Sequence, residues 1–174
     1  ASRGIGREIA LRAARDGANI VIAAKSAEAH PKLPGTIHSV AAEVVAAGGQ
    51  ALALQLDVRD EDAVKAAMAK AFEHFGSIDA VINNAGAIKL MGVEHLPPKR
   101  FDLMFQINTR AVMVCSQAAL PYLKQSRGHI LSLSPPVNLD PKWFANYGPY
   151  TTTKYGMSML TLGMHEEFKK YGIS

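Results

Sequence analysis

ASRGIGREIALRAARDGANIVIAA, residues 1–24, is the stretch that decides the fold. A glycine-containing turn leads into an alanine-rich segment at 7–16, which stops at Gly17 and is followed by the apolar run NIVIAA at 19–24. A glycine directly after a helical segment is typical of a helix end. A short run rich in Val and Ile is typical of a buried strand. The stretch therefore predicts a turn, a helix and a buried strand in quick succession.

The same alternation continues along the chain. Further strands are predicted at 51–56, 80–83 and 129–134, and further helices at 37–47, 60–75, 98–123 and about 150–171. Gly48–Gly49 and Gly76 are expected to end two of these helices, Asp60 to cap one, and Pro97–Pro98 to start another. Strands that alternate with helices favour an α/β fold with a doubly wound parallel sheet.

Composition narrows the class of protein. The 174 residues are 48% hydrophobic and 20% charged, with a formal net charge of +4, which is ordinary for a globular domain. Lys and Arg form no basic run, so no nucleic-acid partner is expected. No stretch is long and apolar enough to span a bilayer, the histidines have no metal-ligand spacing, and the single Cys115 cannot form an internal disulfide.

The turn at residues 2–6 is a candidate phosphate site. The predicted contacts to a dinucleotide come from Ser2, Arg3, Gly4, Ile5 and Gly6. Glycine lets the backbone approach a pyrophosphate, and the helix N-terminus that follows offers free N–H groups. A simple tight turn explains the same residues equally well.

The ends of the predicted strands at 19–24 and 51–56 suggest which dinucleotide binds. An NAD site usually places an acid at the end of the second strand of the sheet, the one that follows the glycine turn and its helix. The strand at 19–24 takes this place, and it ends in Ala23-Ala24-Lys25. Lys25 and Arg3 can neutralise a 2′-phosphate, which favours NADP(H) over NAD(H); two solvated surface cations are the alternative. Asp57 and Val58 are predicted to contact the adenine, and a turn or cap is an equally good role for Asp57.

The four-residue motif Asn83-Asn84-Ala85-Gly86 stands at the end of the predicted strand at 80–83. We expect Asn84, Ala85 and Gly86 to line the cofactor ribose, and Asn83 to tie neighbouring strands together. Because Asn and Gly are turn residues, an ordinary loop is the alternative.

Tyr150 and Lys154 are the candidate catalytic pair. Their i, i+4 spacing places both side chains on one helix face. A free tyrosine has a pKa of about 10 and is a poor base at neutral pH, but a nearby ammonium stabilises a phenolate. Such a tyrosine can exchange a proton with a carbonyl or alcohol oxygen as hydride is transferred.

These motifs, together with Asn108, occur in the order found in the short-chain dehydrogenase/reductase family, which the whole chain resembles. The resemblance implies a Rossmann-like fold with its doubly wound parallel sheet, a nicotinamide cofactor, and interconversion of a small-molecule carbonyl and a secondary alcohol. It implies that Lys154 also binds the ribose and that Asn108 holds a proton-relay water; a buried structural asparagine is the alternative. It further implies a homodimer or homotetramer, for which the apolar faces of 98–123 and 157–168 are candidate surfaces.

Three local features indicate one branch within this family. They are the insertion over 30–37, Ser134-Pro135-Pro136, and Tyr155-Gly156-Met157-Ser158. The branch implies a possible C-terminal sterol-carrier-like domain, and a peroxisomal or mitochondrial location in a eukaryotic cell; otherwise we expect a cytoplasmic protein. The irregular stretch at 26–35 is expected to be a surface loop.

Both ends of the chain look incomplete. No strand precedes the turn at 2–6, and the chain stops where another strand is expected. We therefore expect residues 1–174 to be a single dinucleotide-binding domain that lacks its first strand and C-terminal part.

One position departs from the family pattern. The family's substrate-orienting serine aligns with Pro135, which has neither a hydroxyl nor a backbone N–H. Ser134 can take this role only if the chain bends at the prolines, and Asn138 or Trp143 are substitutes. The departure motivates a second hypothesis, a catalytically impaired dinucleotide-binding sensor; a lipid-handling accessory protein is a third.

Overall fold

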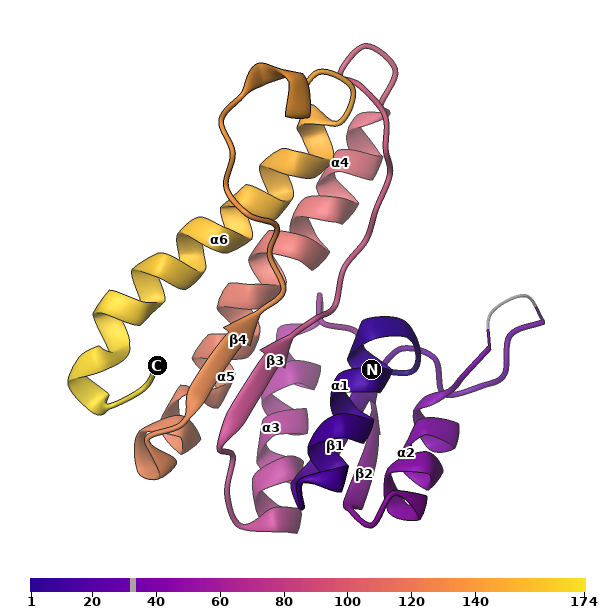
Figure 1. The fold of residues 1–174 in the computed structure, drawn as a ribbon, viewed down its shortest axis with the longest axis vertical. Coiled ribbons are helices and arrows are strands. Elements are labelled where there is room, and N and C mark those ends of the chain that lie inside the picture. Colours follow the sequence, from indigo (N-terminus) through magenta and orange to yellow (C-terminus); the bar gives the residue numbers. More distant parts are fainter. Residues whose placement is uncertain (32–33) are drawn as a thin grey trace. The chain divides into compact units, whose positions relative to one another are not determined.

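The computed structural model describes residues 1–31 and 34–174 (Figure 1). The chain forms two compact units, Ala1–Ile78 and Asp79–Ser174. Lys32 and Leu33, which belong to the predicted insertion, lie outside the described residues.

The first unit contains three helices and two strands. In chain order these are α1 (Gly4–Arg15), β1 (Asn19–Ala24), α2 (Ile37–Ala46), β2 (Gln50–Gln55) and α3 (Glu61–Phe75). The two strands pair in parallel, from Asn19 opposite Gln50 to Ala24 opposite Gln55. A buried apolar cluster joins α1, β1 and α2, and its members are Ala10, Leu11, Ala14, Ile22, Ile37, Val40 and Val44.

The helix ends in this unit follow the local sequence. Gly17, Gly48 and Gly76 all adopt positive φ, which glycine permits without steric cost. The Asp60 side chain accepts a hydrogen bond from the Ala63 N–H at 3.0 Å, which confirms its predicted capping role. Helix α1 begins at Gly4 instead of Arg7, because the glycine turn itself forms the first helical turn.

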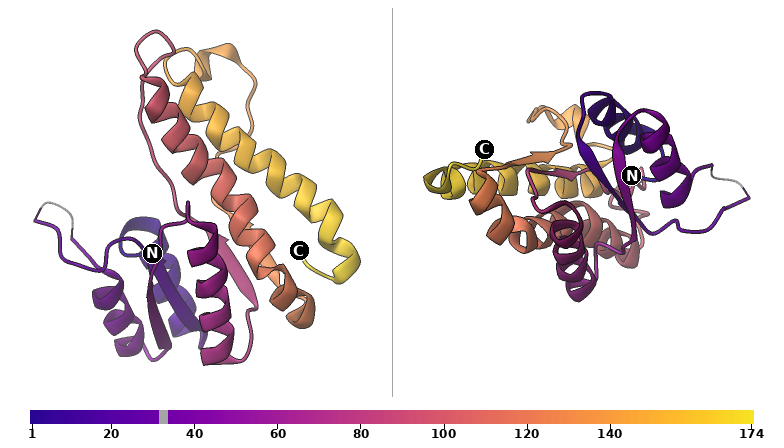
Figure 2. Two further views of the ribbon diagram at one scale, coloured as in Figure 1. Left: turned by 180° about the vertical axis from the view of Figure 1, so that it is seen from behind. Right: turned by 90° about the horizontal axis from the view of Figure 1, so that it is seen from below.

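The second unit is built around two long helical rods. Its elements are β3 (Ala80–Asn83), α4 (Pro98–Phe105), the π-helix η1 (Gln106–Arg110), α5 (Ala111–Ser126), β4 (His129–Ser132), the 3₁₀-helix η2 (Pro141–Trp143), α6 (Gly148–Phe168) and the 3₁₀-helix η3 (Lys169–Tyr171). Strands β3 and β4 are parallel, with Ala80 opposite His129. The rod formed by α4, η1 and α5 lies beside α6 in both Figure 1 and Figure 2.

Three predicted boundaries in this unit were wrong. The single helix predicted over 98–123 extends to Ser126 and contains the π-helical turn η1. The strand predicted to reach Ser134 ends at Ser132, because its partner β3 ends at Asn83, the residue opposite Ser132. The last helix starts at Gly148, two residues early, with Pro149 in its first turn, where proline is well tolerated.

The π-helical turn lies where the two rods pack closely. A Cβ added to Gly156 of α6 would lie 2.9 Å from the Thr109 methyl carbon of η1. Glycine at this position therefore permits the close approach of α6 to the turn that carries Asn108.

The described helices include none with the length and apolar character needed to cross a membrane. In the same part of the chain, no group of three or more His, Cys, Asp or Glu side chains is arranged to hold a metal ion.

Candidate active site

The predicted phosphate turn of the first unit leads directly into α1. Gly4 has φ of +58°, and an added Cβ there would meet nothing within 4 Å. Glycine is thus needed for the backbone conformation, and the space beside it is open. The N-cap residue, Arg3, makes no side-chain capping hydrogen bond. The first N–H groups of α1 are therefore available to an anion.

Arg3 is held by a residue that sequence reasoning missed. Its Nη2 donates to Ser26 Oγ at 2.6 Å. Its Nη1 is buried and has no hydrogen-bond partner among the described residues. A buried, unpaired guanidinium nitrogen is costly unless a ligand supplies an acceptor, so this part of Arg3 suits an anionic group.

The two ends of the predicted surface loop at 26–35 lie close to each other and to the phosphate turn. Ile37 N donates to the Ser26 carbonyl at 2.9 Å. Gly35 has φ of +91°, and a Cβ added there would lie 2.2 Å from the Ser2 carbonyl oxygen. Only glycine therefore fits at residue 35. Ser26 and Gly35 gave no recognisable signal in sequence, because serine and glycine are common in loops.

Lys25 and Asp57 form an ion pair. Lys25 Nζ lies 2.9 Å from Asp57 Oδ2, and Arg59 Nη2 lies 2.5 Å from the same oxygen. Hydrogen bonds from Arg59, and then from Lys25, hold the pKa of the Asp57 carboxyl well below its usual range. Lys25, predicted to contact a 2′-phosphate, and Asp57, predicted to contact the adenine, thus neutralise each other. Val58 beside them is half-buried.

In the second unit, the Asn83–Gly86 segment follows β3. Asn83 is buried, and its Nδ2 lies 3.5 Å from the hydroxyl oxygens of both Ser116 and Ser132. Asn83 therefore links β3 to β4 and α5, as predicted for a residue that ties strands together. Asn84 is half-buried, and Ala85 and Gly86 are exposed, so their backbone is accessible to a ligand.

Asn108 lies in η1 and is fully buried. Its Oδ1 accepts a hydrogen bond from Ala87 N at 2.7 Å, and its Nδ2 donates to Ala87 O at 2.8 Å and to Thr153 Oγ1 at 2.9 Å. The side chain thus holds the segment after Gly86 against α6. This is the structural role given as the alternative for Asn108; the relay water remains a prediction.

Thr153 is a second residue that sequence reasoning missed. Its hydroxyl receives the Asn108 hydrogen bond and donates to the Tyr150 carbonyl at 2.8 Å, and its own carbonyl accepts from Thr109 Oγ1 at 2.7 Å. Thr153 is fully buried. These contacts fix the turn of α6 that carries both Tyr150 and Lys154. The only available signal was its place between the two predicted catalytic residues.

Lys154 reaches the end of β4. Its Nζ donates to the Leu133 carbonyl at 2.6 Å and lies 3.4 Å from Met157 Sδ. Partial burial lowers the pKa of the Lys154 ammonium. Tyr150, one turn earlier on α6, is half-buried. The two side chains therefore extend from one helix face, with the lysine partly shielded from water.

Ser134 is directed at a different part of α6. Its Oγ lies 3.4 Å from the Lys154 carbonyl and forms a hydrogen bond with Ser158 Oγ. The following loop is anchored separately, because Tyr155 OH donates to the Asn138 carbonyl at 2.8 Å and accepts from Asn138 N at 2.9 Å. Among the described contacts, none joins Ser134 to Tyr150.

Comparison with known proteins shows the family of the chain. All 174 residues match a family model described as short chain dehydrogenase. The chain belongs to this family. It is 59% identical over 170 residues to hydroxysteroid dehydrogenase-like protein 2 of Xenopus tropicalis, which covers 97% of the chain and 41% of that protein. The branch indicated by the three local features is thereby confirmed, and the chain spans less than half of this curated relative.

Solved structures confirm the Rossmann-like α/β fold. A short-chain dehydrogenase from Mycobacterium thermoresistibile is 53% identical with a TM-score of 0.95, over 99% of this chain and 62% of that one. A metagenomic short-chain oxidoreductase in complex with NADP is 28% identical, with a TM-score of 0.87 over 98% and 74% of the two chains. Carveol dehydrogenase from Mycobacterium avium in complex with NAD is 25% identical, with a TM-score of 0.83 over 98% and 64%.

Proposed function

We propose that the full-length protein is an NADP(H)-dependent oxidoreductase that interconverts a carbonyl and a secondary alcohol, with Tyr150 as acid/base. The observation that carries this proposal is the α6 turn bearing Tyr150 and Lys154, held in place by Thr153 and Asn108. Family membership supports the oxidoreductase class.

The roles of the residues follow from their chemistry. When bound, a nicotinamide supplies or accepts the hydride. Tyr150 donates its phenol proton to the carbonyl oxygen and takes it back in the reverse direction. Lys154 stabilises the phenolate by its positive charge. Its ammonium has three N–H donors, of which one is bonded to the Leu133 carbonyl, so others can be offered to the ribose.

Contacts to the dinucleotide are proposed in both units. In the first they are Ser2, Arg3, Gly4, Ile5, Gly6, Lys25, Asp57 and Val58, and in the second Asn84, Ala85, Gly86, Tyr150 and Lys154. The chain's own residues fit an anionic dinucleotide, since the α1 N-terminus is uncapped by a side chain and Arg3 Nη1 is buried without a partner.

The NADP(H) preference is supported by Arg3. Its unpaired Nη1 can donate to a 2′-phosphate, and no acid at the end of β1 would repel that group. Lys25 is a weaker candidate because Asp57 already neutralises it. NAD(H) is the alternative cofactor.

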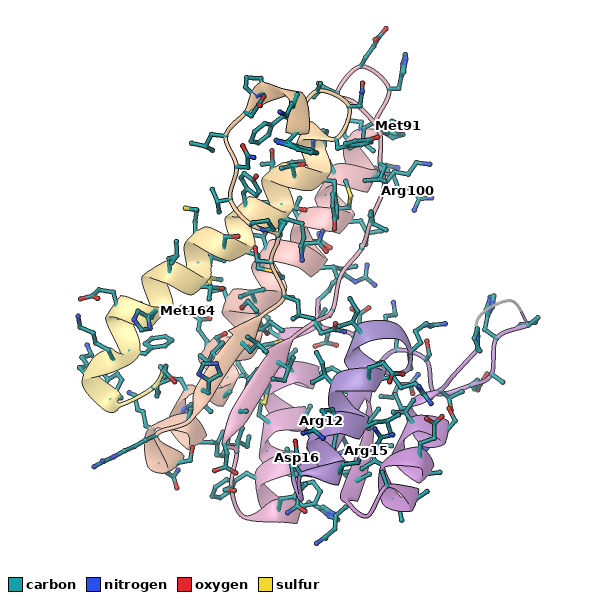
Figure 3. All side chains as sticks on the ribbon, in the orientation of Figure 1. Arg12, Arg15, Asp16, Met91, Arg100 and Met164 are labelled. Carbon is teal, nitrogen blue, oxygen red and sulfur yellow. The ribbon has the colours of Figure 1, made fainter. Side chains whose placement is uncertain are left out.

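Cofactor titration tests this preference. We expect Arg3→Gln to weaken NADPH binding by about tenfold, roughly 1.4 kcal/mol, and to leave NADH binding nearly unchanged. Arg12→Gln is the matched control, because Arg12 also lies on α1 but is 71% exposed and pairs with Asp16 (Figure 3). Equal losses for both cofactors would contradict the preference.

The acid/base role is tested by Tyr150→Phe. We expect NADPH oxidation with ketones, steroids and acyl-CoA-like carbonyls to fall by at least about a hundredfold, while cofactor affinity stays nearly intact. Tyr147→Phe is the control, since Tyr147 lies just before α6 and is 45% exposed. Full activity of the Tyr150→Phe variant would refute the mechanism.

Ser134 favours a second candidate function. Its hydroxyl is bound to Ser158, and Pro135 occupies the position of the family's helper serine. A catalytically impaired dinucleotide sensor would bind cofactor without turning over any member of the carbonyl panel. Turnover that is lost in Tyr150→Phe excludes this candidate.

A homodimer or homotetramer is also proposed. Large apolar side chains remain exposed along the two rods, namely Phe105, Met113, Met159 and Leu162. Exposed apolar side chains that gather in a patch usually mark an interaction surface, so these four are candidates for the subunit contact. Light scattering on wild type and on Leu162→Lys should show loss of the oligomer in the variant.

A further inference from the structure

The second unit contains a small recess that none of the proposed catalytic or cofactor contacts lines. It is formed by Ala87, Ile88 and Lys89, which follow the Asn83–Gly86 segment, and by Arg100, Leu103 and Met104 of α4. Figure 3 labels Arg100 at this end of the unit. The recess has a volume of about 240 Å³.

The charged residues that line the recess are all positive. Lys89 and Arg100 are its two charged lining residues, and no Asp or Glu lines it. Many other cations of the chain have acidic partners, such as Arg12 with Asp16 and Lys25 with Asp57. Among the described residues, the side chains of Lys89 and Arg100 have no ion-pair or hydrogen-bond partner; only the Arg100 backbone N–H is bonded, to the Pro97 carbonyl. Two unpaired cations at one recess favour an anion.

The remaining lining is apolar. Met104 is buried, Leu103 is half-buried, and Ile88 is 63% exposed at the rim. A volume of about 240 Å³ is smaller than the roughly 300–1,000 Å³ of sites that enclose a drug-sized ligand. It suits a head group and a few attached carbons, with the rest of the molecule outside along Ile88.

We propose that this recess binds the anionic head of an amphipathic small molecule, a carboxylate or phosphate carried on an apolar chain. The guanidinium of Arg100 and the ammonium of Lys89 pair with the head group. Ile88, Leu103 and Met104 cover the first carbons of the chain. Neither the cofactor preference nor the catalytic role of Tyr150 is needed for this binding.

Hydrogen bonds link the recess to the α6 turn that carries Tyr150 and Lys154. Ala87 lines it, and both backbone polar groups of Ala87 are held by Asn108, which also binds Thr153. A ligand that shifts Ala87 therefore acts on the residues that position Tyr150. The head group can belong to the substrate itself or to a separate effector, and these two sources differ in their kinetics.

Calorimetric titration of the full-length protein with octanoate, octyl phosphate and octanol tests the proposal. We expect the two anions to bind with affinities at least about tenfold higher than octanol, and more weakly at high salt. The double change Lys89→Gln/Arg100→Gln should lower anion affinity at least about tenfold. Lys99→Gln is the control, because Lys99 is an exposed cation of the same helix turn that does not line the recess.

Three outcomes would overturn the proposal. They are equal binding of octanol and octanoate, unchanged anion affinity in the double variant, and no binding of either anion up to about 10 mM. Competition kinetics separate the two sources, since an anion that mimics substrate competes with it and an effector does not. If Tyr150→Phe loses activity but still binds octanoate, the anion site is independent of the catalytic role of Tyr150.

Discussion

Replacing Asn108 by alanine removes three hydrogen bonds from the interior of the second unit. The lost contacts are those to Ala87 N at 2.7 Å, Ala87 O at 2.8 Å and Thr153 Oγ1 at 2.9 Å. The Asn108 side chain is fully buried, so water cannot replace it without new space. The Ala87 N–H, the Ala87 carbonyl and the Thr153 hydroxyl each lose a hydrogen-bond partner.

The expected loss of stability can be worked from these contacts. Each hydrogen bond contributes about 1 kcal/mol net, which gives roughly 3 kcal/mol for the three. Buried groups left unpaired, and the cavity left by the amide, raise the cost to about 3–5 kcal/mol. Since domains are typically stable by only about 5–15 kcal/mol, this is a large fraction of the whole.

Urea denaturation of the full-length protein measures the loss. Gln106→Ala is the control, because Gln106 lies in the same π-helical turn but is exposed, and it should change the unfolding free energy by less than about 0.5 kcal/mol. Asn108→Asp keeps an acceptor for Ala87 N but loses the donor to Ala87 O, so it should also destabilise. A loss below about 1 kcal/mol for Asn108→Ala would refute the inferred network.

Three further predictions concern other parts of the chain. Gly35→Ala should lower the free energy of unfolding by about 1–3 kcal/mol and weaken cofactor binding, because the new methyl group would overlap the Ser2 carbonyl oxygen at a positive φ. Gly92→Ala is the control, because a methyl group there meets nothing within 4 Å. Equal melting temperatures of the two variants would contradict the close contact at Gly35. Because the pKa of Asp57 is depressed in the folded protein, its contribution to stability is present above pH about 4 and is lost as the pH falls further. In Asp57→Asn the unfolding free energy should therefore fall less steeply on the acid side than in the wild type. Parallel curves of unfolding free energy against pH would exclude this contribution. Burial raises the pKa of the Cys115 thiol to about 11, so a thiol reagent at pH about 8 should react much faster in urea than with the native protein, and equal rates would contradict the burial.

Local structure was largely determined by the sequence alone. The strands at Asn19–Ala24 and Ala80–Asn83 have the predicted bounds, and Asp60 caps α3 as expected. These features depend on near neighbours in the chain, through steric limits on φ and short-range hydrogen bonds. The order of the motifs likewise indicated the family, since each motif is a short run of neighbouring residues that can be recognised without knowing the fold.

The contacts that shape the candidate site were decided only by the tertiary structure. Ser26 binds Arg3, Thr153 binds Asn108, and Ser134 turns to Ser158. Each of these pairs joins residues that are more than 20 positions apart. Their hydrogen bonds depend on which element faces which, a matter of packing that no local pattern encodes. The sequence therefore identified Tyr150 and Lys154 as a pair, and the tertiary structure decided which buried side chains hold their helix turn in place.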